Sequence, residues 1–99
     1  MSQVEDNIIE AVLRYAASKG GRRTQWYVGI AKDPKKALFK VHKVPKNKTP
    51  WMYKFAFDIN EAIRIEDRLL REGFDGDKFP SDRKANGIYV YRKTGETRE

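Results

Sequence analysis

Apolar side chains recur every three or four positions near the start of the chain, which is the spacing of an amphipathic helix. The stripe follows Ser2 and Glu5, which fit a capping box, and stops before Gly20-Gly21, a pair suited to a left-handed helix end. The residues on the stripe are Val4, Ile8, Ile9, Val12, Leu13 and Ala16. We therefore predict a first helix that ends at Gly20.

Alternation of side chains along the chain predicts three strands, each bounded by turn-forming residues. They cover residues 24–30, 51–57 and 88–92. In the first strand Tyr27 and Gly29 share the face opposite Trp26, because successive side chains point to opposite sides of a sheet. A glycine there would let a phosphate backbone approach the sheet closely, or would mark a bulge.

Two further helices are expected between these strands. Asp33 is a good N-cap and Pro34 a good first residue, which predicts a helix over residues 34–41. A capping box at Asp58 opens another helix, which should end at Gly73. The apolar stripe of that helix comprises Ile59, Ala62, Ile63, Leu69 and Leu70.

Helices and strands thus alternate three times, which predicts an α+β fold with a small three-stranded, mainly antiparallel sheet flanked by helices. With 99 residues, of which 39% are apolar and 12% aromatic, the chain can build one modest core. We expect residues 1–99 to form a single domain, with irregular loops at 43–50 and 74–86 and a frayed tail at 95–99.

The composition excludes several kinds of site. The chain has no cysteine, so disulfides and thiolate zinc sites are excluded, and His42 is its one histidine. No apolar run approaches the roughly 20 residues that span a bilayer, and Glu5 and Asp6 lie where a signal peptide would be basic and then apolar. We expect a cytoplasmic protein, a monomer or weak dimer with no membrane partner.

The net charge of +7 is concentrated in residues 32–48, which hold seven lysines against Asp33 alone. These lysines are Lys32, Lys35, Lys36, Lys40, Lys43, Lys46 and Lys48, and Arg22 and Arg23 add charge before the first strand. Such a cluster is typical of a surface that binds a polyanion, most often the phosphates of nucleic acid, with DNA favoured over RNA here. The alternatives are a solvated helix face and a contact for an acidic protein surface.

The strand Tyr27-Val28-Gly29, the turn into the helix at Pro34 and the following His42 resemble the second half of the GIY-YIG nuclease motif. That family begins with a Gly-Ile-Tyr strand, and Gly87-Ile88-Tyr89 occurs here at the C-terminal end, where the last strand could fill the missing place as a permuted pairing. The resemblance implies Tyr27, His42 and Tyr89 as catalytic residues. Each of these side chains could equally be a packed or hydrogen-bonded structural residue.

Glu66 lies within the predicted apolar stripe of the last helix. An unpaired carboxylate is costly to bury, so it must find a lysine or tyrosine partner, reach water or hold a cation. In the resembled family a glutamate in a similar setting binds the divalent metal, and Ala62, Glu66 and Leu69 match that setting. The resemblance implies Mg²⁺ at Glu66, because a single carboxylate suits an ion that keeps most of its water.

The main departure from the family is Ala37, which stands where the catalytic arginine is expected. Lys36 and Lys40 could supply charge there, but lysine lacks the planar fork that grips a phosphate in two places. We therefore expect a nucleic-acid-binding domain whose Mg²⁺-dependent phosphodiester hydrolysis is weak or lost. The alternatives are a non-enzymatic interaction or inhibitor protein on a degenerate nuclease fold, and an active nuclease that uses lysine.

Five aromatic side chains of the first two strands are expected mostly in the core by default, namely Trp26, Trp51, Tyr53, Phe55 and Phe57. If one or two of them are exposed near Lys46 and Lys48, they could instead stack on nucleic-acid bases.

Overall fold

A computed structural model describes residues 3–76 and 85–99 of the chain. Its helical segments are α1 (Gln3–Lys19), the short 3₁₀ turn η1 (Arg23–Gln25), α2 (Pro34–Lys36), the π turn η2 (Ala37–Val41) and α3 (Ile59–Arg71). Its strands are β1 (Trp26–Ala31), β2 (Trp51–Phe55), β3 (Asp75–Gly76) and β4 (Gly87–Arg92). None of the helices in these residues is long and apolar enough to cross a membrane.

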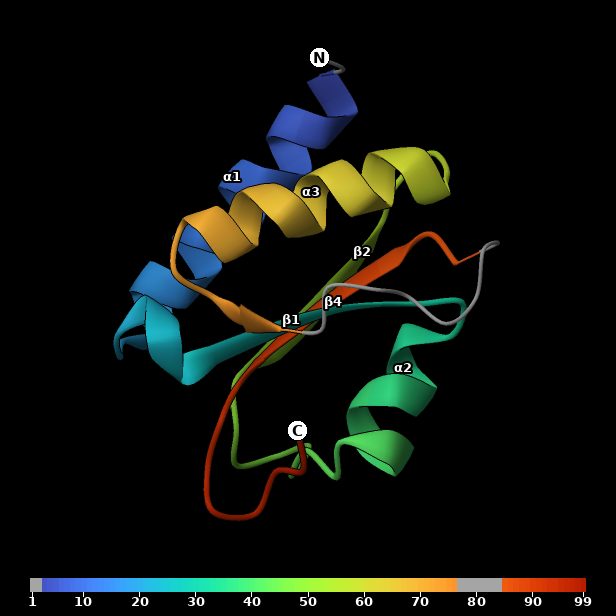
Figure 1. The fold of residues 1–99 in the computed structure, drawn as a ribbon. Helices are drawn as coiled ribbons and strands as arrows, with labels where there is room; N and C mark the ends of the chain where they lie inside the picture. The colour runs from blue at the N-terminus through green and yellow to red at the C-terminus, as the bar shows by residue number, and fades with distance from the viewer. Residues whose placement is uncertain (1–2, 77–84) are drawn as a thin grey trace.

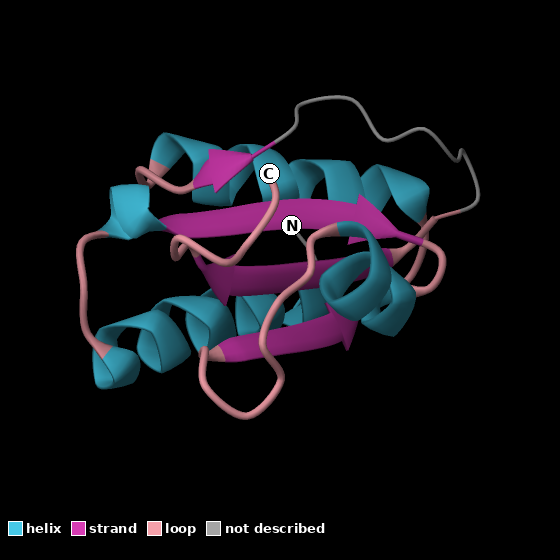
Figure 2. Ribbon diagram, turned by 90° about the horizontal axis from the view of Figure 1, so that it is seen from below, coloured by secondary structure: helices cyan, strands magenta, loops and turns pink. Residues whose placement is uncertain are grey.

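Helices cover both faces of one mixed sheet (Figure 1). Helices α1 and α3 pack on one face, over the main core that includes Trp26, Val28, Ile65 and Val90. Segments α2 and η2 lie on the other face, over a smaller core built around Leu38 and the strand tyrosines. Figure 2 looks onto this second face, with α2 in front of the strands.

The four strands lie in the order β2-β4-β1-β3. Strand β4 is antiparallel to both β1 and β2, so the predicted α+β class and mainly antiparallel sheet are confirmed. The pairing of the last strand with the first is also confirmed, since Tyr89 lies opposite Gly29. The helix-flanked sheet thus places Tyr27 and Tyr89 on neighbouring strands.

The predicted number of strands was wrong, because Asp75 and Gly76 form a further strand parallel to β1. The sequence predicts an irregular loop over residues 74–86, of which residues 77–84 lie outside the described part of the chain. A strand of two residues is too short to produce a visible alternation. Gly76 suits the place, because a Cβ there would lie 2.5 Å from the carbonyl oxygen of Val28.

The predicted end of the first helix is confirmed by Gly20 and Gly21, with φ of +83° and +91°. Its stripe was partly wrong: Val4 is 49% exposed, while Glu5 is buried and accepts a bond from Arg64 at 2.7 Å. Ser2, the expected cap, lies outside the described residues.

The stripe of α3 is rotated from the one we predicted, because Ile63 is exposed. The buried residues are Glu61, Ala62, Ile65, Glu66 and Leu69, which keep helical spacing. Two of these buried residues are glutamates. A stripe predicted from apolar residues alone is therefore centred away from the face that is buried. The prediction that Glu66 is buried is confirmed, at 2% exposure.

The helix predicted over residues 34–41 is present, but its second half is a wider turn than expected. The side chain of Asp33 caps its start by accepting from the Lys36 amide at 3.1 Å. The His42 amide donates to the carbonyl of Ala37, five residues earlier, at 2.9 Å. This is the hydrogen-bond spacing of a π-helix. This turn leads directly to His42. Strand β2 ends at Phe55 rather than residue 57, and Phe57 is 83% exposed.

Candidate nucleic-acid interface

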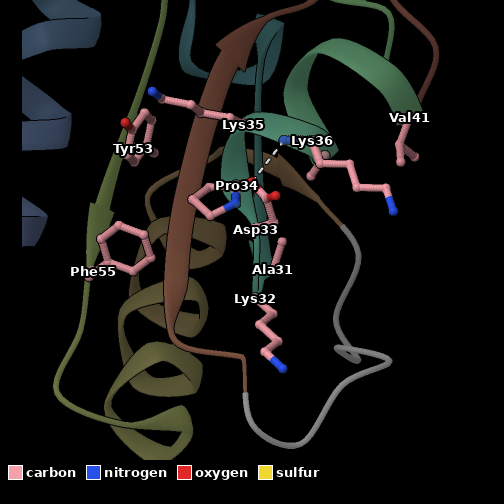
Figure 3. A pocket seen from close by; sticks show the side chains of 10 residues that line it. Ala31, Lys32, Asp33, Pro34, Lys35, Lys36, Val41, Tyr53 and Phe55 are labelled. Carbon is pink, nitrogen blue, oxygen red and sulfur yellow. Dashed lines mark hydrogen bonds between the residues drawn. The ribbon is translucent and has the colours of Figure 1, made fainter.

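An open groove of about 820 Å³ lies between the start of α2 and strand β2. We call it the α2 groove. It is lined by Ala31, Lys32, Asp33, Pro34, Lys35, Lys36, Ala37, Val41, Tyr53 and Phe55 (Figure 3). The groove therefore combines lysines from one wall with aromatic rings from the other.

Strand β4 separates the two walls of the α2 groove, since it pairs with β2 and with β1. At its start, a Cβ on Gly87 would lie 3.0 Å from the ring of Pro34, so the glycine lets Pro34 pack closely. Lys35 extends toward the opposite wall, and its Nζ lies 6.0 Å from the ring centre of Tyr53 (Figure 3). A charge from α2 thereby reaches an aromatic ring on β2.

The structure divides the predicted basic residues between several places. Lys32, Lys35 and Lys36 line the α2 groove. Lys46 and Lys48 line a second hollow of about 460 Å³ beside Trp51, together with Lys19 and Arg92. Lys40, Lys43 and Arg22 are exposed. Arg23 forms an ion pair with Glu72.

Ala37, where the resembled family carries its arginine, lines the α2 groove beside Lys36. It is 9% exposed. The position thus borders the groove that the lysines border, although its methyl group supplies no charge.

The three predicted catalytic residues come together beneath η2. His42 Nε2 lies 2.7 Å from the Tyr89 hydroxyl, and the ring centres of His42 and Tyr27 are 5.0 Å apart. Tyr91, which our prediction did not include, stacks on Tyr27 at 5.3 Å and places its hydroxyl 3.1 Å from His42 Nδ1. We call these four residues the tyrosine–histidine cluster.

The tyrosine–histidine cluster is a small closed core. Tyr27, His42 and Tyr89 are each 6% exposed and Tyr91 is fully buried. This burial is what the packed, hydrogen-bonded alternative requires, and the catalytic role of the three residues stays a prediction. None of the four lines the α2 groove.

Gly29 is the reason why Tyr89 can lie flat over β1. A Cβ at residue 29 would lie 2.3 Å from the Tyr89 hydroxyl oxygen. The space above this glycine, which we had considered for a phosphate backbone, is therefore filled by the phenol ring.

The segment expected to fray contacts the tyrosine–histidine cluster. The Arg98 amide donates to the His42 carbonyl at 2.7 Å, and the Arg98 carbonyl lies 2.7 Å from His42 Nδ1. Tyr91 in turn donates to the Glu99 carboxylate at 3.3 Å. A carbonyl can only accept, so the Nδ1 of His42 donates to the Arg98 carbonyl.

Glu66, the predicted metal ligand, comes from the other side of the sheet. Helix α3 packs against the face that carries Trp26 and Val28, whereas Tyr27 and Tyr89 project from the opposite face. The structure therefore does not bring Glu66 together with the tyrosine–histidine cluster. Within residues 3–76 and 85–99, no three His, Asp or Glu side chains are grouped as a metal would need. Mg²⁺ binding stays a prediction.

Burial raises the pKa of Tyr91, and the nearby Glu99 carboxylate raises it further. The folded protein then keeps the phenolic proton above pH 10, where the unfolded chain releases it. The stabilisation that comes from the protonated Tyr91 is complete below pH 10. As the pH rises above 10, the free energy of unfolding falls by at most about 1.4 kcal/mol per pH unit. Urea unfolding from pH 8 to 11 should show a shallower alkaline loss for Tyr91→Phe than for the wild type. If the wild type and Tyr91→Phe lost equal stability between pH 8 and 11, the raised pKa of Tyr91 would be contradicted.

No protein-family model, curated protein or solved structure matches the chain. The resemblance to GIY-YIG nucleases therefore rests on its motif residues alone, and the structure assigns the chain to the α+β class without assigning it to a family.

Proposed function

We propose that this domain binds nucleic acid, with phosphates held by the lysines of the α2 groove. The observation that carries the proposal is the gathering of Lys32, Lys35 and Lys36 around one open groove that also holds two aromatic rings. Phosphate neutralisation by lysine and arginine supplies most of non-specific nucleic-acid affinity.

The charges of these three lysines are available to a ligand. Most basic side chains over α1 and α3 are paired with carboxylates, as in Arg14 with Glu10 and Arg71 with Asp67. Among the described residues, no lysine of the α2 groove lies within ion-pair distance of a carboxylate. The one acidic residue in the groove, Asp33, uses its side chain to cap α2.

Binding without hydrolysis is the form of the function that these placements support. The residues expected to act on water are buried beneath η2, and Glu66 belongs to the opposite face of the sheet. At the groove itself, the methyl group of Ala37 stands where the family's arginine would neutralise the scissile phosphate. Removing an arginine from such a site lowers the rate by about 10³–10⁵-fold.

Charge reversal in the groove tests this function. The variant Lys35→Glu/Lys36→Glu should weaken binding of a 20-base oligonucleotide by about 10–100-fold at 0.1 M salt, because two phosphate contacts are lost. The slope of log affinity against log salt should become shallower by about 1.4 for a single strand or 1.8 for a duplex. Fluorescence anisotropy at several salt concentrations measures both quantities.

The matched control is Arg14→Glu/Arg71→Glu, which makes the same change in net charge on α1 and α3. It should leave the affinity nearly unchanged at 0.1 M salt, because charges beyond about 10 Å are screened. Ala37→Arg, which adds a cation to the groove, should strengthen binding. Equal losses in the two double variants, or no loss in either, would overturn the assignment of the α2 groove.

A further inference from the structure

Strand β2 carries three aromatic side chains on the face that looks toward α2. Trp51, Tyr53 and Phe55 occupy alternate positions, with ring centres 6.3 Å and 5.9 Å apart. We call them the aromatic row. Phe55 is 53% exposed and the other two rings are half-buried. Because β2 is the last strand of the described sheet, the row lies along its edge.

Each end of the aromatic row meets a basic hollow. Tyr53 and Phe55 line the α2 groove, where the ammonium group of Lys35 lies over the Tyr53 ring (Figure 3). Trp51 lines the second hollow, with Lys19, Lys46, Lys48 and Arg92. The aromatic row therefore has cations near both of its ends.

Trp51 packs against a second aromatic ring, which itself lies near a cation. Phe39 packs edge-on against Trp51, with ring centres 4.9 Å apart, and the Lys46 ammonium lies 5.5 Å from the Phe39 ring centre. Trp51 is also held by the bond from its indole nitrogen to the Lys46 carbonyl at 3.0 Å. The ring is therefore fixed in place beside a cation before any ligand arrives.

The spacing of the rings favours unpaired bases over a duplex. Bases in a duplex follow one another every 3.4 Å or so along each strand and stack on one another, which leaves their faces covered. Rings about 6 Å apart can accept successive bases only if these are unstacked and spread along the strand. Single strands offer such bases, and every base has a face that an aromatic ring can stack on.

We propose that the ligand is a single-stranded polynucleotide that lies along the aromatic row, with bases on the exposed rings and phosphates in the two basic hollows. The inference rests on the proposed function and names its ligand class. DNA and RNA share this chemistry, so the test uses both oligo-dT and oligo-rU. Neither forms a duplex with itself.

Intrinsic fluorescence reports directly on contact with the row. Of the two tryptophans, Trp26 is fully buried in the main core, whereas Trp51 is half-buried and belongs to the row. Addition of a 12-base oligo-dT or oligo-rU should quench the emission of Trp51, and a 12-base-pair duplex should leave it nearly unchanged. An equal response to the duplex would contradict the inference.

Phe55→Ala should lower the affinity for the single strand by about 5–150-fold, which is the range for loss of one base–aromatic stack. Phe57→Ala is the matched control, because Phe57 is 83% exposed and does not line the α2 groove. It should bind as the wild type does. The affinity for the duplex should be the same in both variants.

The outcomes separate this inference from the proposed function. If Lys35→Glu/Lys36→Glu weakens binding but Phe55→Ala does not, phosphates bind in the groove without stacking, and the inference fails alone. If poly-glutamate binds more tightly than oligo-dT and oligo-rU do, and Phe55→Ala leaves its affinity unchanged, the surface takes an acidic protein, which overturns the single-strand ligand. If neither oligonucleotide nor duplex binds, both proposals fail.

Discussion

Gly29→Ala is expected to destabilise the domain by about 1–3 kcal/mol, the usual cost of forcing an extra group into a packed site. The added Cβ would lie 2.3 Å from the phenol of Tyr89. Strand β1 has partners on both sides, β4 and β3, so the backbone cannot easily move away. The ring must therefore shift, which disturbs its 2.7 Å contact with His42. Thermal unfolding should show a loss of roughly 4–8 °C per kcal/mol for a domain of this size.

Two controls separate a clash with Tyr89 from the general cost of replacing a glycine. At Gly95 nothing lies within 4 Å of an added Cβ, so Gly95→Ala should change the free energy of unfolding by less than about 0.5 kcal/mol. In a Tyr89→Ala background, Gly29→Ala should cost much less than in the wild type, because the ring is gone. Equal costs in both backgrounds would show that Tyr89 is not the cause.

His42→Ala is expected to lower the free energy of unfolding by about 2–4 kcal/mol, because it removes several buried hydrogen bonds of the imidazole ring at once. His42 contacts the hydroxyls of Tyr89 and Tyr91 and the carbonyl of Arg98 through its two ring nitrogens. Urea unfolding measures the loss. The Arg98 amide donates to the His42 carbonyl. Its hydrogen exchange should also become faster, because the backbone at residue 42 is no longer anchored by the histidine side chain.

A matched variant replaces His42 by phenylalanine, which keeps a ring in the core and removes only the polar nitrogen atoms. His42→Phe alone should still be destabilising, because the Tyr89 hydroxyl loses its 2.7 Å hydrogen bond to the histidine ring. Combining it with Tyr89→Phe removes the second partner as well and should cost less than the sum of the single changes. A cost below about 1 kcal/mol for His42→Ala, with unchanged exchange at Arg98, would show that the ring does not hold the tail.

Local sequence patterns predicted the elements whose signals are local. The capping residues Asp33 and Asp58 and the glycines after α1 marked helix ends correctly. Alternation in β1 correctly placed Tyr27 on the face opposite Trp26. The burial of Glu61 in α3 and the two-residue strand β3 escaped prediction, because neither produces an apolar periodicity.

The candidate interface was predictable only in part. The lysine cluster is visible in the sequence because its members are neighbours along the chain. The aromatic wall of the α2 groove was not, because Tyr53 and Phe55 meet Lys35 only after β4 has paired between β1 and β2. The anchoring of Arg98 on His42 joins residues 56 positions apart and has no local signal.

The central position of β4 has a consequence for how the chain folds. Strand β1 pairs only with β3 and β4, and β2 pairs only with β4, so neither has a described partner until residues 75–92 have been synthesised. Joining such distant segments closes long loops, which slows folding relative to a chain of neighbouring hairpins. During translation the backbone edges of both strands, which carry aromatic side chains, stay open to pairing with other chains. Ribosome-bound nascent chains that stop before Gly87 should therefore be prone to association, and those that include β4 should not.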